Sequence, residues 1–149
     1  MAYTISDACI GCRACALICP ATAISGEKKQ LHFIDGQACI ECGACGRVCP
    51  SGAVTDEFGL VLERIPKKEW ERPYFDLSAC LSCTVCLDTC PTGALTQERQ
   101  KVGSTHLFPC LENEKLCIAC GFCVQDCPVD AVTMGARQSA PPKEPVKAG

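Results

Sequence analysis

Four cysteine runs with the same spacing constrain what this chain can fold into. In each run, three cysteines are separated by two residues, a fourth follows after three more residues, and a proline comes directly after it. The runs begin at Cys9, Cys39, Cys80 and Cys117, and they end at Pro20, Pro50, Pro91 and Pro128. They contain all but one of the 17 cysteines in 149 residues. Metal binding therefore has to be considered before any fold with an ordinary apolar core.

The similarity between the four runs extends beyond the cysteines. After each proline comes a short segment in which alanine is followed by Ile, Val or Leu and then by Ser or Thr, at 21–25, 51–55, 92–96 and 129–133. The proline suits the first position of a helical turn, and the apolar residue with Ser or Thr predicts a short strand. Apolar or aromatic residues precede the runs at 3–5, 32–34, 74–75 and 107–108. Each repeat is thus predicted to be strand, cysteine loop, helical turn and strand, which is an α+β fold.

The lengths of the gaps between the runs predict two modules. There are 19 residues between Cys19 and Cys39, 30 between Cys49 and Cys80, and 26 between Cys90 and Cys117. The central gap is the longest and contains a charged stretch bracketed by prolines, which is typical of a linker. We therefore expect a first module at 1–57, a linker at 58–73, a second module at 74–135 and a disordered tail, rich in Ala, Pro and Lys, at 136–149.

The composition predicts that metal ligation stabilises these modules. Aromatic residues make up only 5% of the chain, and units of about 60 residues bury little apolar surface on their own. Bonds to a metal that form only in the folded state would compensate, so we expect the metal-free chain to be largely unfolded. No secretory signal is recognised at 1–6 and no apolar run approaches about 18 residues. These features predict a reducing, cytoplasmic location and no insertion into a membrane.

Other uses of cysteine fit the runs poorly. A zinc site takes its four ligands from two separated pairs, not from three closely spaced cysteines followed by Cys-Pro. A disulfide framework conflicts with a reducing compartment, and a catalytic cysteine would leave one of the runs incomplete. The chain has no phosphate-binding loop, no dinucleotide-binding glycine motif and no recognisable acid–base pair. We therefore predict no catalytic residue and no small-molecule substrate pocket.

Each half of the chain, 1–57 and 74–135, resembles a bacterial two-cluster ferredoxin in its cysteine runs. The resemblance implies that three cysteines of one run and the fourth cysteine of the other hold one [4Fe-4S] cluster. Carried over, the ligand sets are Cys9, Cys12, Cys15 and Cys49 for the first cluster; Cys39, Cys42, Cys45 and Cys19 for the second; Cys80, Cys83, Cys86 and Cys127 for the third; and Cys117, Cys120, Cys123 and Cys90 for the fourth.

The order in which the runs pair has an alternative. In some four-cluster subunits of molybdenum oxidoreductases the runs pair in nested order, the first with the fourth and the second with the third. Nested pairing would move only the fourth cysteine of each run to another cluster. The regular runs and the short gap before Cys39 favour sequential pairing, because consecutive elements tend to be neighbours.

The resemblance implies one-electron transfer through four [4Fe-4S] clusters. Four clusters exceed what a diffusible carrier needs, so we expect the electron-transfer subunit of a larger oxidoreductase in anaerobic metabolism. Similar polyferredoxin subunits accompany tungsten- or molybdenum-dependent aldehyde and formate oxidoreductases and hydrogenases. A free low-potential ferredoxin is the alternative, followed by an iron–sulfur redox sensor.

The charge indicates what kind of partner to expect. The chain has a formal net charge of −3, and each cluster with its four thiolates adds about −2 when oxidised. Such an anionic protein argues against nucleic acid as a partner. It favours docking on a basic patch of a catalytic subunit or of another redox protein.

Three residues near the runs have two interpretations each. Cys110, the one cysteine outside the four runs, is expected to be a small buried hydrophobic residue and not a ligand or redox thiol, since no ligand position is vacant. Arg13 and Arg47 lie inside cysteine runs, where a cation beside a cluster would stabilise its reduced form. Either side chain would otherwise extend into solvent.

The linker aromatics and the histidines also have alternatives. Trp70 and Tyr74 flank the end of the linker and are expected to pack the two modules together, or else to anchor a partner. His32 and His106 have no convergent partners in the sequence, so both are expected to be structural or exposed.

Overall fold

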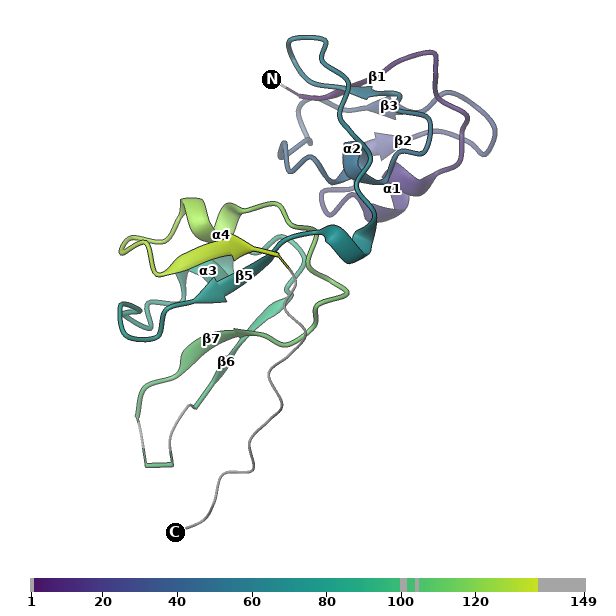
Figure 1. Cartoon of the computed structure of the whole chain (residues 1–149). Helices are drawn as coiled ribbons and strands as arrows, with labels where there is room; N and C mark the ends of the chain where they lie inside the picture. Colours follow the sequence, from purple (N-terminus) through teal and green to yellow (C-terminus); the bar gives the residue numbers. More distant parts are fainter. Residues whose placement is uncertain (1, 100–101, 104, 137–149) are drawn as a thin grey trace.

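A computed structural model describes residues 2–99, 102–103 and 105–136. The tail predicted at 136–149 lies, apart from residue 136, outside the described residues. The chain forms two lobes joined by a single segment (Figure 1). Within the described ranges, no helix has the length and apolar character needed to cross a membrane.

The first lobe contains two antiparallel strand pairs and two short helices. Its elements are β1 (Thr4–Ile5), α1 (Ala14–Ile18), β2 (Ile24–Ser25), β3 (Phe33–Ile34), α2 (Ala44–Val48) and β4 (Val54–Thr55). Strand β1 pairs with β4, and β2 pairs with β3. The strand before the first cysteine run therefore pairs with the strand after the second run, and the two inner strands pair with each other. This arrangement interlocks the two repeats.

The second lobe repeats this topology with longer strands. The connecting segment contains the 3-10 helix η1 (Lys67–Glu69), and the elements of the second lobe are β5 (Arg72–Phe75), α3 (Val85–Thr89), β6 (Leu95–Glu98), β7 (Phe108–Leu111), α4 (Phe122–Gln125) and β8 (Val132–Gly135). Strand β5 pairs with β8, and β6 pairs with β7. The expected α+β fold, with small antiparallel strands and short helical turns, is confirmed. Strand β5 begins at Arg72, inside the stretch 58–73 that we expected to be a linker.

Three positions in every repeat have a left-handed backbone. Two of them flank the middle cysteine of the triplet, and the third is the second residue after the proline; φ lies between 50° and 77° at all of them. The residues before the middle cysteine are Gly11, Glu41, Ser82 and Ala119, and those after it are Arg13, Gly43, Thr84 and Gly121. The residues after the proline are Thr22, Gly52, Gly93 and Asp130. For a residue other than glycine this conformation costs about 1–2 kcal/mol. The left-handed conformation recurs at these positions whether or not the residue is glycine, so the geometry of the cysteine loop requires this conformation. Each middle cysteine stands at the apex of a tight turn.

The lobes have small cores in which cysteine is prominent. The first core consists of Cys15, Ile34, Cys45, Cys49, Ala53 and Val54. The second consists of Cys86, Leu95, Cys123 and Val132. Few large apolar side chains are buried in either core, so hydrophobic burial alone stabilises each lobe weakly.

A third cluster of buried residues joins the lobes. It contains Ala44 of α2, Trp70 of the connecting segment and Ile118 of the second lobe. Trp70 is only 3% exposed, and its indole Nε1–H donates a hydrogen bond of 2.8 Å to the Ile65 carbonyl. The guanidinium of Arg47 lies 5.6 Å from the centre of the Trp70 ring and donates to the Ile118 carbonyl at 2.7 Å. Trp70 therefore packs the two halves together.

The segment between the lobes folds back on the first lobe. The Leu62 N–H donates to the Val54 carbonyl at 2.8 Å, and the Ile65 N–H donates to the Arg47 carbonyl at 3.0 Å. Leu62 covers Gly46 so closely that a Cβ on Gly46 would overlap its side chain. The ordered course of this segment brings Trp70 to the junction.

Replacing Trp70 with alanine should separate the two lobes. Removal of a buried tryptophan costs about 3–5 kcal/mol, and the cluster that contains Trp70 includes residues of both lobes. Trypsin should cleave the cluster-loaded variant after Arg64, Lys67 or Lys68 at least about tenfold faster than the parent, a change equivalent to about 1.4 kcal/mol. The matched control Phe58→Ala removes a side chain that is 79% exposed and should leave the rate unchanged. Equal cleavage of both variants would contradict this role of Trp70.

Candidate metal centres

Four small cavities each collect four cysteines. They are lined by Cys9, Cys12, Cys15 and Cys49; by Cys19, Cys39, Cys42 and Cys45; by Cys80, Cys83, Cys86 and Cys127; and by Cys90, Cys117, Cys120 and Cys123. We number these sites by the run that supplies three of their cysteines. The first, second, third and fourth sites therefore contain the triplets that begin at Cys9, Cys39, Cys80 and Cys117. Each site combines the triplet of one run with the last cysteine of the neighbouring run. No site among the described residues mixes cysteines of the two lobes, which supports sequential pairing.

The spread of the thiols favours a multinuclear cluster over a single ion. Among the described residues, no group of three or more His, Cys, Asp or Glu side chains converges closely enough to hold one metal ion. A zinc ion needs its sulfur ligands about 2.3 Å from one centre. A cubane instead takes one thiolate on each of its four irons, so its ligands stand further apart. The donor sets therefore fit [4Fe-4S] clusters.

The last cysteine of each run accepts the same backbone hydrogen bond. The donors are the alanines four residues later: Ala23 to Cys19 Sγ at 3.4 Å, Ala53 to Cys49 at 3.3 Å, Ala94 to Cys90 at 3.4 Å and Ala131 to Cys127 at 3.3 Å. All four alanines are buried. The alanine N–H holds this sulfur in place, and bonds of this kind to a ligand sulfur influence the reduction potential of a cluster.

The third cysteine of a run is a buried thiol with a raised pKa. Burial, with the charges of the neighbouring cysteines, raises the pKa of Cys45 to about 12, of Cys86 to about 11 and of Cys123 to about 12. These groups are protonated at neutral pH when no metal is present. Because iron binds the thiolate, it must displace their protons.

The last cysteines of two runs show the opposite shift. Burial alone would raise the pKa of Cys49, but hydrogen bonding with the Ser51 hydroxyl and from the Ala53 N–H outweighs it, so the pKa is lowered. The pKa of Cys90 is lowered in the same way, with Thr92 in place of Ser51. A hydroxyl two residues after the cysteine therefore favours the thiolate that iron binds.

The middle cysteines of the runs differ in their surroundings. Cys12 of the first site and Cys83 of the third are exposed. Cys42 of the second site and Cys120 of the fourth are partly buried and pack against the junction cluster around Trp70. The first and third sites are thus open to solvent, and the second and fourth sites lie on either side of the junction.

Arg13, Arg47 and Cys110 have distinct positions. Arg13 is exposed and lines the first site. Arg47 donates to the Cys42 carbonyl at 2.9 Å as well as to Ile118, so its cation lies between the second and fourth sites. Cys110 lies in β7, partly buried, with Sγ 3.3 Å from the Thr96 hydroxyl, and lines none of the four sites.

His32 lies in the first site with one ring nitrogen unpaired. The residue is 1% exposed and lines the cavity with its four cysteines. Its Nδ1 donates to the Gln30 carbonyl at 3.1 Å, whereas Nε2 has no hydrogen-bond partner within the described part of the chain. Gly26 leaves room for the ring, since a Cβ on Gly26 would lie 2.7 Å from His32 Cγ. A cluster bound in this cavity would lie beside this unpaired nitrogen.

Ser82 gives the third site a comparable feature. Its Oγ atom is buried without a partner among the described residues, and the residue lines the cavity that contains Cys80, Cys83, Cys86 and Cys127. Buried polar atoms are normally satisfied, so these two orphaned atoms, like the convergent thiols, fit clusters in the first and third sites.

Replacing His32 with phenylalanine should lower the reduction potential of the first cluster. Phenylalanine would place an apolar ring where the polar imidazole now lines the cavity, and an apolar ring stabilises the extra negative charge of a reduced cluster less well. Loss of about 1 kcal/mol of this interaction corresponds to a fall of about 40 mV for one electron. Redox titration followed by electron paramagnetic resonance would measure it, with His106→Phe as the matched control. A potential that stays at the parent value in both variants would contradict this role of His32.

Gradual removal of iron should release the cysteines in the sets defined by the cavities. Exposed Cys12 opens the first site to a chelator before the second, whose Cys42 is covered at the junction. In alkylation followed by mass spectrometry, Cys49 should therefore be labelled at the rate of Cys15 and not at the rate of Cys45. Cys110 serves as a control whose labelling is independent of iron loss. Labelling of Cys49 together with Cys45 would contradict the assignment.

Comparisons with known proteins identify iron–sulfur domains in this chain. Models described as a 4Fe-4S dicluster domain match residues 8–54, 38–94 and 72–128. A chain of the formate dehydrogenase–heterodisulfide reductase–formylmethanofuran dehydrogenase complex from Methanospirillum hungatei aligns with 24% sequence identity and a TM-score of 0.43. The alignment covers 92% of this chain but 53% of that one, so this chain spans about half its length. No curated protein sequence matches at a significant level. The dicluster matches overlap and together extend over residues 8–128, so this part of the chain consists of 4Fe-4S dicluster ferredoxin domains.

Proposed function

We propose that this protein carries single electrons through four [4Fe-4S] clusters, as the non-catalytic electron-transfer subunit of a larger oxidoreductase. The observation that supports this most strongly is the collection of sixteen cysteines into four cavities of four. Clusters of this kind, when bound, accept and release one electron each. The ligands of the first cluster are Cys9, Cys12, Cys15 and Cys49; of the second, Cys39, Cys42, Cys45 and Cys19; of the third, Cys80, Cys83, Cys86 and Cys127; and of the fourth, Cys117, Cys120, Cys123 and Cys90.

The packing of the cysteines gives the sites a spatial order. Within the first lobe, Cys15 of the first site and Cys45 of the second belong to one core. Within the second lobe, Cys86 of the third site and Cys123 of the fourth do the same. Across the junction, Cys42 and Cys120 pack against one buried cluster. The sites therefore follow one another as first, second, fourth and third.

The residues around the thiols keep this series in place. The alanine N–H groups orient the last cysteine of each run, and the buried cores exclude water from one side of each site. Trp70 and Arg47 fix the second site relative to the fourth. Arg47 also keeps a positive charge between two sites that become anionic when loaded.

The exposed ends of the series suit an extended electron path. Cys12 and Cys83 are the exposed middle cysteines of the first and third sites, and each end offers a place where a redox partner can approach. Because two internal sites separate these ends, the arrangement favours a subunit that connects two partners and not a free ferredoxin. We expect a catalytic subunit and another redox protein as partners and, from the cysteine usage, a cytoplasmic location.

Iron and sulfide analysis tests the number of clusters. The anaerobically loaded protein should contain about 16 irons and about 16 sulfides per chain, four of each per cubane. Cys110→Ser should leave these values unchanged, whereas replacing Cys80, Cys83, Cys86 and Cys127 together should remove about four of each. About 12 irons in the parent protein would contradict four cubane sites.

Size-exclusion chromatography of native extract tests the role as a subunit. The protein should elute in a complex much larger than its own 15.9 kDa, together with an oxidoreductase activity. Elution only as a brown 15.9 kDa species would favour the free ferredoxin.

A further inference from the structure

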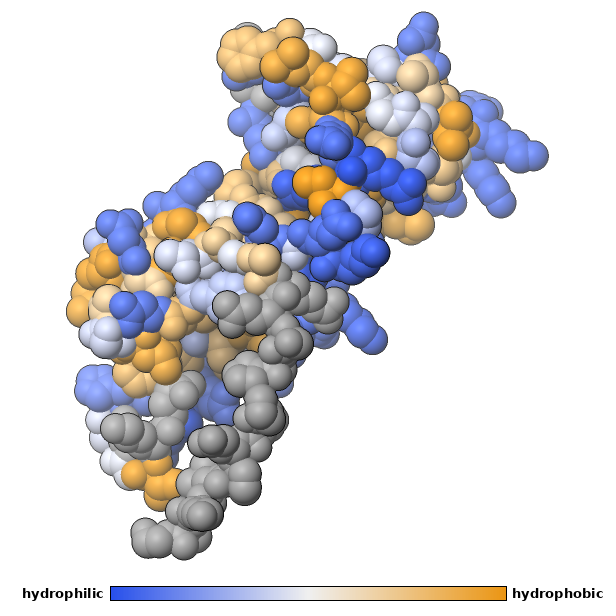
Figure 2. All heavy atoms as spheres, in the orientation of Figure 1, coloured by the Kyte–Doolittle hydropathy of each residue, from blue (hydrophilic) through white to orange (hydrophobic). Residues whose placement is uncertain are grey.

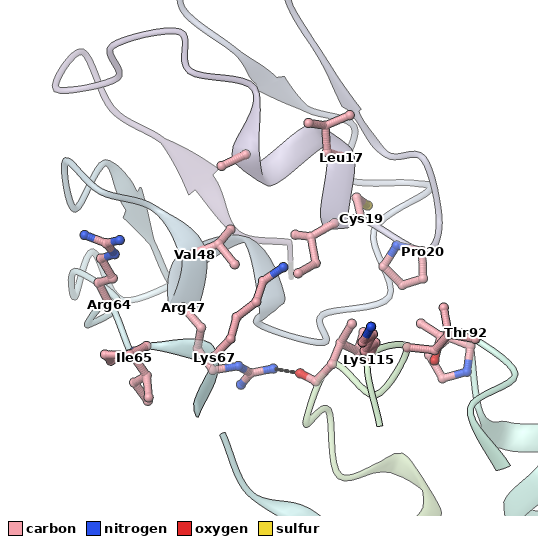
Figure 3. Close-up of a pocket in the computed structure, with 16 residues that line it drawn as sticks. Leu17, Cys19, Pro20, Arg47, Val48, Arg64, Ile65, Lys67, Thr92 and Lys115 are labelled. Atoms are coloured by element: carbon pink, nitrogen blue, oxygen red, sulfur yellow. Dashed lines mark hydrogen bonds between the residues drawn. The ribbon is translucent and has the colours of Figure 1, made fainter. Parts of the chain in front are cut away.

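A cleft of about 760 Å³ opens at the junction between the lobes. Figure 3 shows Leu17, Cys19 and Pro20 of the first lobe on one side and Thr92 and Lys115 of the second lobe on the other. The connecting segment, with Arg64, Ile65 and Lys67, forms a third wall. The sequence predicted no substrate pocket, and this open cleft depends on the docking of the two lobes.

The cleft is basic on a protein that is acidic in total. Arg47, Arg64, Lys67 and Lys115 line it, and no Asp or Glu side chain is among its lining residues. Arg47 is engaged with the Cys42 and Ile118 carbonyls, whereas the other three side chains are exposed. With a formal net charge of −3 for the chain, this local excess of cations selects for an anionic group.

The walls between the cations are apolar. Leu17 is 80% exposed, Leu116 is 44% exposed and Ile65 is 36% exposed, and Pro20 and Pro91 lie beside them in the lining. Figure 2 shows apolar and hydrophilic residues gathered next to each other at the waist between the lobes. Exposed leucines flanked by cations complement a chain that carries both apolar side chains and carboxylates.

The cleft also reaches two of the metal centres. Cys19 of the second site lines it directly. On the opposite wall, Pro91 and Ile118 are the immediate neighbours of Cys90 and Cys117, which belong to the fourth site. A partner in the cleft would lie against the middle of the series of sites and not at its exposed ends.

We propose that the junction cleft is a docking site for an acidic segment, with apolar side chains between its carboxylates, from a redox partner protein. The redox character of the partner rests on the proposed electron-transfer function, whereas the acidic and apolar character of the segment rests on the cleft alone. The apolar walls favour a polypeptide over a nucleic acid, whose backbone offers phosphates and no aliphatic groups. The expectation that partners present basic patches applies to the acidic surface outside the cleft.

Binding of designed peptides to the loaded protein tests this proposal. The probe is a fluorescein-labelled octapeptide of alternating leucine and glutamate, compared with leucine–lysine and serine–glutamate octapeptides and with a labelled single-stranded oligonucleotide. Fluorescence anisotropy should show binding of the leucine–glutamate peptide in preference to the other three. The double variant Lys67→Glu with Lys115→Glu should weaken that binding about tenfold or more, because it reverses two charges of the cleft.

Two matched controls separate the cleft from general charge and hydrophobicity. Lys68→Glu changes an exposed neighbour of Lys67 outside the cleft lining and should leave binding unchanged. Leu17→Ser should weaken binding, whereas Leu60→Ser, at a leucine that is 65% exposed elsewhere, should not.

Three outcomes would overturn the proposal. They are equal binding by the parent and the double variant, equal binding of the serine–glutamate peptide, and tighter binding of the oligonucleotide. Iron is measured in every sample, so a shortfall of iron in the parent counts against the proposed function. A loss of peptide discrimination at full iron content counts against the cleft alone.

Discussion

The exchange of one cysteine between neighbouring repeats is the constraint on which the rest of the structure depends. Three thiols of each run line one cavity, and the fourth thiol lines the next. Neither repeat of a lobe can complete such a set of four thiols alone, so both must fold together. The strand pairs follow the same exchange, since β1 pairs with β4 and β5 pairs with β8. In cores that contain few large apolar residues, the bonds to iron would stabilise what hydrophobic burial cannot.

The junction between the lobes brings the two pairs of sites together. The middle cysteine of every run stands between two left-handed residues at the apex of a turn. Its surroundings depend on whether that turn lies at the junction or on the outer surface of the lobe. Cys42 and Cys120 face the junction, whereas Cys12 and Cys83 are exposed. Trp70, Arg47 and Ile118 thereby connect two separate pairs of sites into one series of four. They also create the basic cleft, which exists only because the lobes are docked.

Part of this arrangement follows from the spacing of the sequence, because the three cysteines of each triplet are close neighbours along the chain. The resemblance to a two-cluster ferredoxin implied the sets of four thiols that line the cavities, and the apolar segments around the runs predicted the strands. The sequence did not reveal that the alanine N–H groups bond to ligand sulfur, although the alanine recurs at one position in all four repeats. It also gave no reason to place His32 in the first site or Arg47 across the junction. Those contacts depend on how distant segments pack, and the linker expected at 58–73 supplies part of that packing.

Diffraction from crystals of the loaded protein at the iron absorption edge would test the central claim most directly. The account predicts four separate cubane positions in the order first, second, fourth and third, with the closest pair across the lobes being those bound by Cys42 and Cys120. Each position should be bonded to three cysteines of one run and one of its neighbour. A cubane bound by four cysteines of a single run, or a closest pair across the lobes that excludes the second or the fourth site, would contradict it.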